Sequence, residues 1–232
     1  TIVAFGTSAP ELVVNLIAAI NQNSSLVLGN VLGSNIFNIL GIIGIAALIY
    51  PLQVKSRTTW IEIPLSFLAA VVLLVMALKQ LIDGTPFDSI VRTDGIVLLL
   101  FFSIFIAYSF HSISSDSSPE TVEVHKLSAL RSVLYILIGL GLLIVGGRVI
   151  VQSAVAAFKK NVDIAIGNIV GSNIFNVFFI LGLSAVVYPV EVTTSSAFDL
   201  LVHTGTAGLL FAVIFIGKGR KTGSTAPTFC KI

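Results

Sequence analysis

Two segments of the chain decide the fold: residues 29–39 read GNVLGSNIFNI, and residues 167–177 read GNIVGSNIFNV. Eight of the eleven positions are identical at an offset of 138 residues. Self-similarity of this kind indicates two related halves. Polar, glycine-interrupted segments at matching positions of two apolar halves are typical of transporters built from repeats, with the substrate site at the repeat interface.

The composition places both halves in a membrane. Of the 232 residues, 56% are hydrophobic and only 10% are charged, and the mean hydropathy is +1.03. Soluble domains carry about 25% charged residues, so an ordinary globular protein and a disordered chain are both excluded. The single Cys230 excludes an internal disulfide and a cysteine metal cluster. A net charge of +2 gives no indication of a nucleic-acid partner, and the expected partner is the lipid bilayer.

The apolar runs have the length of membrane helices, because about 20 residues cross a hydrocarbon core of ~30 Å. They are continuous and rich in Leu, Ile, Ala and Gly, whereas barrel strands would alternate apolar and polar residues. We therefore predict an all-α, multi-pass membrane protein. The runs cover residues 1–20, 26–50, 60–78, 95–110, 127–158, 164–188 and 197–216.

The chain divides around a short Ser-rich, acidic stretch that reads as a cytoplasmic linker. The expected parts are a first repeat at 1–110, incomplete at its N-terminus, the linker at 111–126, a second repeat at 127–216 and an atypical tail at 217–232. If residues 127–158 crossed twice, ten Lys and Arg would lie on the linker side against Lys79 and Arg92 opposite, as the positive-inside rule prefers. Thirty-two residues are too few for two spans, so we predict an internal deletion near 151–152.

The segment GTSAPE at residues 6–11 predicts an interrupted membrane helix. Pro10 has no N–H and clashes with the carbonyl four residues earlier, so the helix should open near Gly6 and Thr7 and free carbonyl oxygens as cation ligands. Glu11 lies near the middle of its run, where an ionised carboxylate costs at least ~2.5 kcal/mol. We expect its side chain to face a polar cavity or to bind a cation.

Polar residues recur every four positions in the repeated motif and therefore lie on one helix face. The two stripes consist of Asn30, Ser34 and Asn38 and, at the same offset, Asn168, Ser172 and Asn176. A single Ser or Asn in a membrane helix is commonly a packing or hydrogen-bonding residue, and the repetition favours an ion pathway. Carboxylate, hydroxyl, amide and carbonyl oxygens without a nearby His or Cys suit a hard ion such as Ca²⁺ or Na⁺ and suit zinc or copper poorly.

GTSAPE followed by a duplicated GN..GSN..N motif resembles the Na⁺/Ca²⁺ exchangers of the calcium/cation antiporter superfamily, in their prokaryotic form. The resemblance implies ten helices in two inverted five-helix halves, of which the first, most of the seventh and the last are missing from this chain. It also implies alternating access in the inner (plasma) membrane, with Na⁺ and Ca²⁺ competing for one set of midplane oxygens and Na⁺ driving Ca²⁺ out. No resident cofactor and no enzymatic activity are expected.

The same resemblance assigns ligand roles in both repeats. It makes Glu11 a calcium carboxylate and the Thr7 carbonyl a further ligand, places Ser8, Ser34 and Asn38 at sodium, and gives Ser172 and Asn176 the matching positions of the second repeat. His203, near the start of the last run, is expected to have a hydrogen-bonded or interfacial role rather than to relay protons.

The second repeat lacks its own GTS.PE segment, because the position 23 residues before Ser172 is Val149. Tight calcium sites take about 6 to 8 oxygen ligands and more than one carboxylate. We therefore expect slow or absent calcium exchange by this chain. Two alternatives remain: coupling of Ca²⁺ to protons at the lone carboxylate, and a transport-inactive fragment that serves as a structural or assembly partner.

Overall fold

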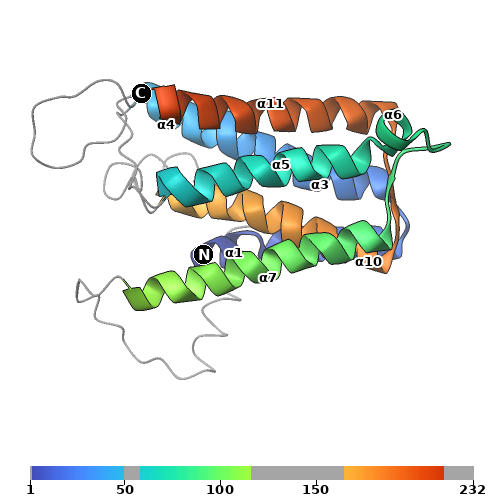
Figure 1. Ribbon diagram of the computed structural model, residues 1–232, viewed down its shortest axis with the longest axis horizontal. Helices are drawn as coiled ribbons and strands as arrows, with labels where there is room; N and C mark the ends of the chain where they lie inside the picture. The colour runs from blue at the N-terminus through green and yellow to red at the C-terminus, as the bar shows by residue number, and fades with distance from the viewer. Residues whose placement is uncertain (1, 50–57, 116–164, 217–232) are drawn as a thin grey trace, which may run out of the picture.

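The computed structural model describes residues 2–49, 58–115 and 165–216. The long helices lie side by side, and the described connections at residues 21–23, 84–91 and 188–193 gather at one end of the bundle (Figure 1). Five helical segments are long and apolar enough to cross a membrane: Ser24–Leu48, Thr58–Ala77, Arg92–Phe110, Ala165–Val187 and Thr194–Phe215. These confirm five of the predicted runs. The run at 127–158, the proposed deletion and the tail at 217–232 lie outside the described residues.

Most elements in the described part of the chain are helical. The α-helices are α1 (Ile2–Thr7), α2 (Ala9–Ile20), α3 (Ser24–Ile36), α4 (Ile45–Ile49), α5 (Ile63–Ala77), α6 (Lys79–Asp83), α7 (Arg92–Ser115), α10 (Gly182–Val187) and α11 (Thr194–Ile216). The described residues also form three π-helical segments, η1 (Phe37–Gly44), η2 (Thr58–Glu62) and η4 (Asn176–Leu181), and residues 165–175 form a helix that leads into η4. α7 continues to Ser115, into the segment predicted as a linker.

The two copies of the repeated motif run in opposite directions. α3 starts at the end of the bundle that carries α6, whereas the helix over residues 165–187 finishes there (Figure 1). In both copies the polar motif runs directly into a π-helix, η1 in the first and η4 in the second. The inverted arrangement predicted for the two halves is therefore present, and each copy ends in a helix type that is frequent at functional sites.

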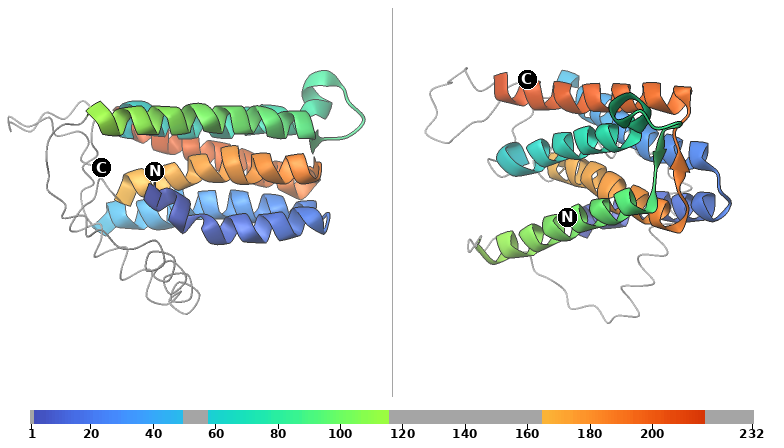
Figure 2. Two further views of the ribbon diagram at one scale, coloured as in Figure 1. Left: turned by 90° about the horizontal axis from the view of Figure 1, so that it is seen from below. Right: turned by 45° about the vertical axis from the view of Figure 1, so that its right-hand side comes forward.

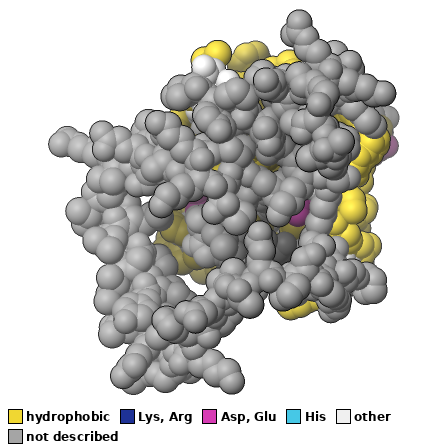
Figure 3. Space-filling view, turned by 90° about the vertical axis from the view of Figure 1, so that its left-hand side faces the viewer, with side chains coloured by type: hydrophobic (Ala, Val, Ile, Leu, Met, Phe, Trp, Pro, Cys, Tyr) yellow, Lys and Arg dark blue, Asp and Glu magenta, His cyan; other side chains and the backbone are white. Residues whose placement is uncertain are grey.

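The second copy of the motif forms the centre of the bundle. Of the apolar window in Ala165–Val187, 83% is buried, against 33% or less in the other four spans. Its Ile174 and Phe178 belong to the core together with Leu28 and Val31 of α3. On the outer helices large apolar side chains remain exposed, and hydrophobic side chains line the flank of the bundle in Figure 3. In a bilayer this exposed apolar flank faces lipid tails.

A small antiparallel ladder joins the two repeats at one end. β1 (Ser89–Ile90) precedes α7, β2 (Val190–Glu191) precedes α11, and Ile90 pairs with Val190. This ladder is the part of the described chain that the all-α prediction did not contain. It connects the α6–α7 loop of the first half to the α10–α11 loop of the second (Figure 2).

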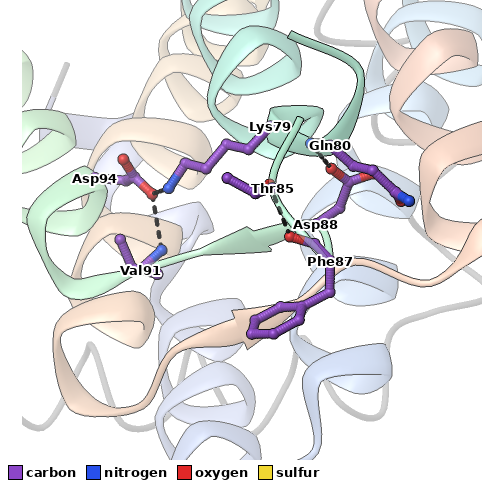
Figure 4. A network of polar contacts seen from close by, with 7 residues as sticks. All are labelled: Lys79, Gln80, Thr85, Phe87, Asp88, Val91 and Asp94. Carbon is purple, nitrogen blue, oxygen red and sulfur yellow. Dashed lines mark hydrogen bonds and ion pairs between the residues drawn. The ribbon is translucent and has the colours of Figure 1, made fainter. Parts of the chain in front are cut away.

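The loop before β1 is held by two carboxylates (Figure 4). Asp94 forms an ion pair with Lys79 and accepts a hydrogen bond from the backbone N–H of Val91 at 2.8 Å. Asp88 accepts from the backbone N–H of Gln80 at 2.6 Å. These contacts order the connection between α5 and α7. At this end of the bundle, the carboxylates thus stabilise the loop within the first repeat, and the ladder joins the first repeat to the second.

α7 and α10 approach each other closely because glycines face across their contact. A Cβ on Gly95 would lie 2.6 Å from the carbonyl oxygen of Gly182 and 3.0 Å from the amide nitrogen of Val186. A Cβ on Gly29 of α3 would meet nothing within 4 Å. A side chain would therefore clash with α10 at Gly95 but would find free space at Gly29.

We expect Gly95→Ala to destabilise the bundle by about 1–3 kcal/mol, because the added methyl group forces α7 away from α10. Gly29→Ala is the matched control and should be neutral or slightly stabilising, since alanine is the better helix former. The measurement is the thermal unfolding midpoint of each purified variant in the same detergent. Equal midpoints for the two variants would contradict the close helix contact.

Candidate cation-binding site

The first predicted membrane run is interrupted at Ser8. α1 ends at Thr7 and α2 begins at Ala9, with Pro10 in the first turn of α2. The break lies within one residue of the position expected from the proline, which cannot donate a hydrogen bond to the carbonyl of Gly6. The Ser8 side chain is buried, and its carbonyl accepts from Leu12 N–H at 3.1 Å.

The interrupted helix touches the second repeat at its polar stripe. Thr7 Oγ1 lies 3.0 Å from Ser172 Oγ. α2 and the helix over 165–187 run side by side in the same direction (Figures 1 and 2). One helical turn beyond this contact on both helices lie Glu11 and Asn176, since four residues rise about 6 Å. Glu11 therefore stands level with Asn176, the last residue of the second stripe.

Glu11 is half-buried, and its Oε2 is buried without a hydrogen-bond partner among the described residues. Its backbone carbonyl accepts from Asn30 Nδ2 at 3.3 Å, and the same nitrogen donates to Asn15 Oδ1 at 2.6 Å. Asn15 Nδ2 in turn donates to the carbonyl of Val27 at 3.2 Å. Asn30 thus joins α3 to α2 rather than to the second repeat, and the carboxylate remains available to a cation.

Asparagines of the two repeats bind each other in reciprocal pairs. Asn35 Nδ2 donates to the carbonyl of Asn173 at 3.3 Å, and Asn173 Nδ2 donates to the carbonyl of Asn35 at 3.4 Å. Asn38 Nδ2 donates to Asn173 Oδ1 at 2.9 Å, and Asn176 Nδ2 donates to Asn35 Oδ1 at 2.9 Å. Each bond has a mate at the offset of 138 residues, so the two motifs meet about a local pseudo-two-fold axis.

The amide of Asn176 has a defined orientation. Its Nδ2 donates to Asn35 Oδ1 and also to Ser34 Oγ at 3.2 Å, while Ser34 Oγ is 3.1 Å from the carbonyl of Val31, to which it donates. Both amide protons of Asn176 are therefore used, and its buried Oδ1 has no partner within the described part of the chain. Asn168 Oδ1 is likewise buried and has no partner in that part of the chain. Buried oxygens of this kind call for an explanation such as a bound ion.

The structure brings together Thr7 with Ser172 and Ser34 with Asn176, and it joins Asn38 to the second repeat through Asn173. Asn30 binds α2 only, and Asn168 makes no side-chain hydrogen bond to the other predicted site residues that are described. Sequence reasoning assigned no role to the central residues Asn15, Asn35 and Asn173. The duplication itself could have found the last two, because both are identical at the repeat offset.

A second carboxylate approaches the second stripe. A Cβ on Gly167 would lie 3.3 Å from Glu62 Oε2, so Glu62 reaches the central helix next to Asn168. Within residues 2–49, 58–115 and 165–216, no group of three or more His, Cys, Asp or Glu gathers. Amides, hydroxyls and carbonyls would therefore supply most of the oxygens of a cation site here.

Comparison with known proteins identifies the family. A family model described as sodium/calcium exchanger protein matches residues 1–111 and 149–225. The chain belongs to the sodium/calcium exchanger family. The inner membrane protein YrbG of Escherichia coli (strain K12) is 33% identical over 83% of this chain and 69% of its own length. The putative antiporter CaxA of Alkalimonas amylolytica is 27% identical over 95% of this chain and 80% of its own.

The fold of this exchanger-family protein is also shared with a solved structure. A structure of the sodium-calcium exchanger NCX_Mj superposes with a TM-score of 0.67 at 22% identity, covering 91% of this chain and 76% of that one. The family resemblance and the inverted-repeat fold predicted from the motifs are thereby confirmed. The protein is an integral, multi-pass membrane protein.

Because the inter-repeat asparagine bonds are related by the repeat offset, we expect the two mate pairs to have similar coupling free energies. In a double-mutant cycle, Asn38→Ala and Asn173→Ala should show a coupling of roughly 0.6–1.7 kcal/mol, the range for hydrogen bonds between membrane helices. The mate cycle of Asn176→Ala and Asn35→Ala should give a similar value, measured as free energies of unfolding. Asn38→Ala with Asn15→Ala shares no partner and should be additive. Additivity in both test cycles would mean that the inter-repeat bonds do not form.

Proposed function

We propose that this exchanger-family protein is a calcium/sodium antiporter that binds Ca²⁺ and Na⁺ in alternation at one site between its repeats. The ligand set would draw on Glu11 and the carbonyl of Thr7, on the hydroxyls of Ser8, Ser34 and Ser172, and on the amide oxygens of Asn30, Asn38, Asn168 and Asn176. Its substrates are the two ions, and alternating access of the two halves carries them across the membrane.

One observation carries the proposal: buried oxygens without partners belong to Glu11 and to Asn168 and Asn176 of the second polar stripe. Glu11 Oε2 and Asn176 Oδ1 lack a hydrogen-bond partner among the described residues, and each lies one helical turn beyond the contact between Thr7 and Ser172. Oxygen atoms left unpaired inside a membrane protein are costly unless they bind a cation or water. The contact between Thr7 and Ser172 supports a site shared by both repeats.

The charge of the site explains how the two ions would compete. Glu11 brings one negative charge, which nearly balances one Na⁺ and leaves a Ca²⁺ half-compensated. Hydroxyl and amide oxygens add dipoles that suit either hard ion. We infer that sodium displaces calcium readily here and that calcium affinity is low, so that exchange by this chain is slow.

The location and topology are part of the same proposal. The protein would lie in the inner (plasma) membrane with the 111–126 segment as a cytoplasmic linker between the repeats at 1–110 and 127–216. The ladder end, which carries Lys79 and Arg92, would then face away from the cytoplasm. The relative YrbG, named as an inner membrane protein, supports this location.

Glu11→Gln tests the binding site directly. Loss of the carboxylate charge should raise the Ca²⁺ concentration needed for half-maximal thermal stabilisation at least tenfold, which corresponds to about 1.4 kcal/mol. The control is Glu191→Gln in β2, where the side chain is exposed at the ladder end. Unchanged calcium stabilisation in Glu11→Gln would contradict the proposed site.

Coupling is tested in vesicles that contain the purified chain. An outward Na⁺ gradient at constant pH should drive slow Ca²⁺ uptake that Glu11→Gln abolishes. Uptake that follows a pH gradient and ignores Na⁺ would assign proton coupling instead. Cation-dependent stabilisation without any uptake would identify a transport-inactive chain that retains its binding site.

A further inference from the structure

One residue outside both repeated motifs reaches the inter-repeat amides. His203 of α11 is 2% exposed, and its Nε2 lies 3.3 Å from Asn35 Nδ2. Asn173, the repeat mate of Asn35, has no third partner of this kind in the described part of the chain. His203 therefore adds an asymmetric contact to an otherwise symmetric set of bonds.

The partners of Asn35 fix the direction of its amide. Nδ2 faces the carbonyl of Asn173, and Oδ1 faces the donor nitrogen of Asn176. A reversed amide would place two oxygens together at Asn173 and two NH₂ groups together at Asn176, which is unfavourable on both sides. The assignment of nitrogen and oxygen thus follows from the hydrogen-bond network.

This orientation determines the tautomer of His203. One proton of the Asn35 NH₂ group goes to Asn173, and the other points to His203 Nε2. An amide NH₂ only donates, so Nε2 must carry a lone pair and the neutral ring must hold its proton on Nδ1. His203 Nδ1 is buried and has no partner within the described residues, so the ring is held by its Nε2 contact.

The contact continues to the cation site. His203 Nε2 accepts the second amide proton of Asn35, and Asn35 Oδ1 accepts a hydrogen bond from Asn176 Nδ2. Asn176 Nδ2 donates its other proton to Ser34 Oγ. The amide plane of Asn176 is therefore set by a chain of hydrogen bonds that begins at His203. Its end is Asn176 Oδ1, the oxygen left without a partner.

We propose that His203 is a positioning residue for ion binding: its Nε2 holds the Asn35 amide, and through Asn35 it aims Asn176 Oδ1 at the cation. This inference rests on the proposed function of the site. His203 touches no ion itself. Its effect is to keep a ligand oxygen from rotating away, so its loss reduces ion affinity more than it reduces folding.

The test compares cation titrations of the full chain, with Na⁺ and Ca²⁺ added separately and thermal stabilisation as the readout. His203→Leu removes the acceptor and should raise the half-saturating concentration of both ions about tenfold. His203→Gln keeps an acceptor oxygen at a similar reach and should stay within about threefold of the unsubstituted chain.

Thr204→Val is the matched control on α11. Thr204 Oγ1 donates to the carbonyls of Leu200 at 2.9 Å and Ala70 at 3.4 Å, away from the asparagines. This variant should lower the unfolding midpoint without changing the half-saturating ion concentrations. Equal ion affinities in His203→Leu and the unsubstituted chain, or equal losses in His203→Leu and His203→Gln, would overturn the positioning role.

A spectroscopic readout does not depend on transport. In protein with ¹⁵N-labelled histidine, the resonances lost in His203→Gln should be those of a neutral ring protonated on Nδ1. A ring protonated on Nε2 would overturn the inference, whatever the ion titrations give. If the unsubstituted chain responds to neither ion while the Nδ1 tautomer is present, the proposed function fails and the hydrogen bond to Asn35 stands.

Discussion

The structure depends on one constraint: an amide group inside a membrane must find its partners within the protein, because hydrocarbon offers none. The motif duplicated at an offset of 138 residues carries several asparagines into the bundle. Asn35 and Asn173 solve the problem by exchanging hydrogen bonds with each other's backbone, and Asn38 and Asn176 complete the arrangement from both sides. The polar groups that are costly in lipid thus become the contact that holds two inverted halves in register.

The same pairing favours cations over anions at the proposed site. The donors of Asn176 and Asn30 are used within the protein, whereas Asn176 Oδ1, Asn168 Oδ1 and Glu11 Oε2 remain unpartnered among the described residues. Next to Glu11, Asn168 and Asn176 the unpartnered atoms are therefore acceptors, as the proposed cation site requires, whereas the unpartnered donor, His203 Nδ1, belongs to a ring that reaches these residues only through Asn35. The break at Ser8 acts in the same direction, because Pro10 withholds a donor from the carbonyl of Gly6.

Much of this arrangement could be predicted from the sequence. Run lengths predicted the spans, the duplication predicted two related halves, and the family resemblance implied their inversion. Pro10 predicted the interruption to within one residue. The selection of every fourth residue found Ser34 and Asn38 but passed over Asn35, because Asn35 faces the other repeat, and only the crossing of two distant helices defines that face. Asn15 and His203 lie outside the motif, so their partners follow from tertiary packing alone. The short β1–β2 ladder depends on two loops 100 residues apart and has no local pattern that would predict it.

The departures from symmetry matter as much as the symmetry. Gly171 packs against α1, where a Cβ would lie 3.2 Å from Ala4 Cβ, whereas a Cβ on its mate Gly33 would meet nothing within 4 Å. The position that corresponds to Glu11 before the second stripe is Val149. Glu11 therefore has no counterpart at the repeat offset, and the second carboxylate, Glu62, approaches the amides from another position, beside Asn168. The amides of the two repeats pair with each other, but the negative charge of Glu11 has no counterpart at the repeat offset. One carboxylate would compensate the charge of a monovalent ion and only part of the charge of a divalent ion. Each unit of uncompensated charge in a low-dielectric interior is costly. At the proposed site, the balance between Na⁺ and Ca²⁺ would thus be set less by the number of oxygens around the ion than by the charge of Glu11.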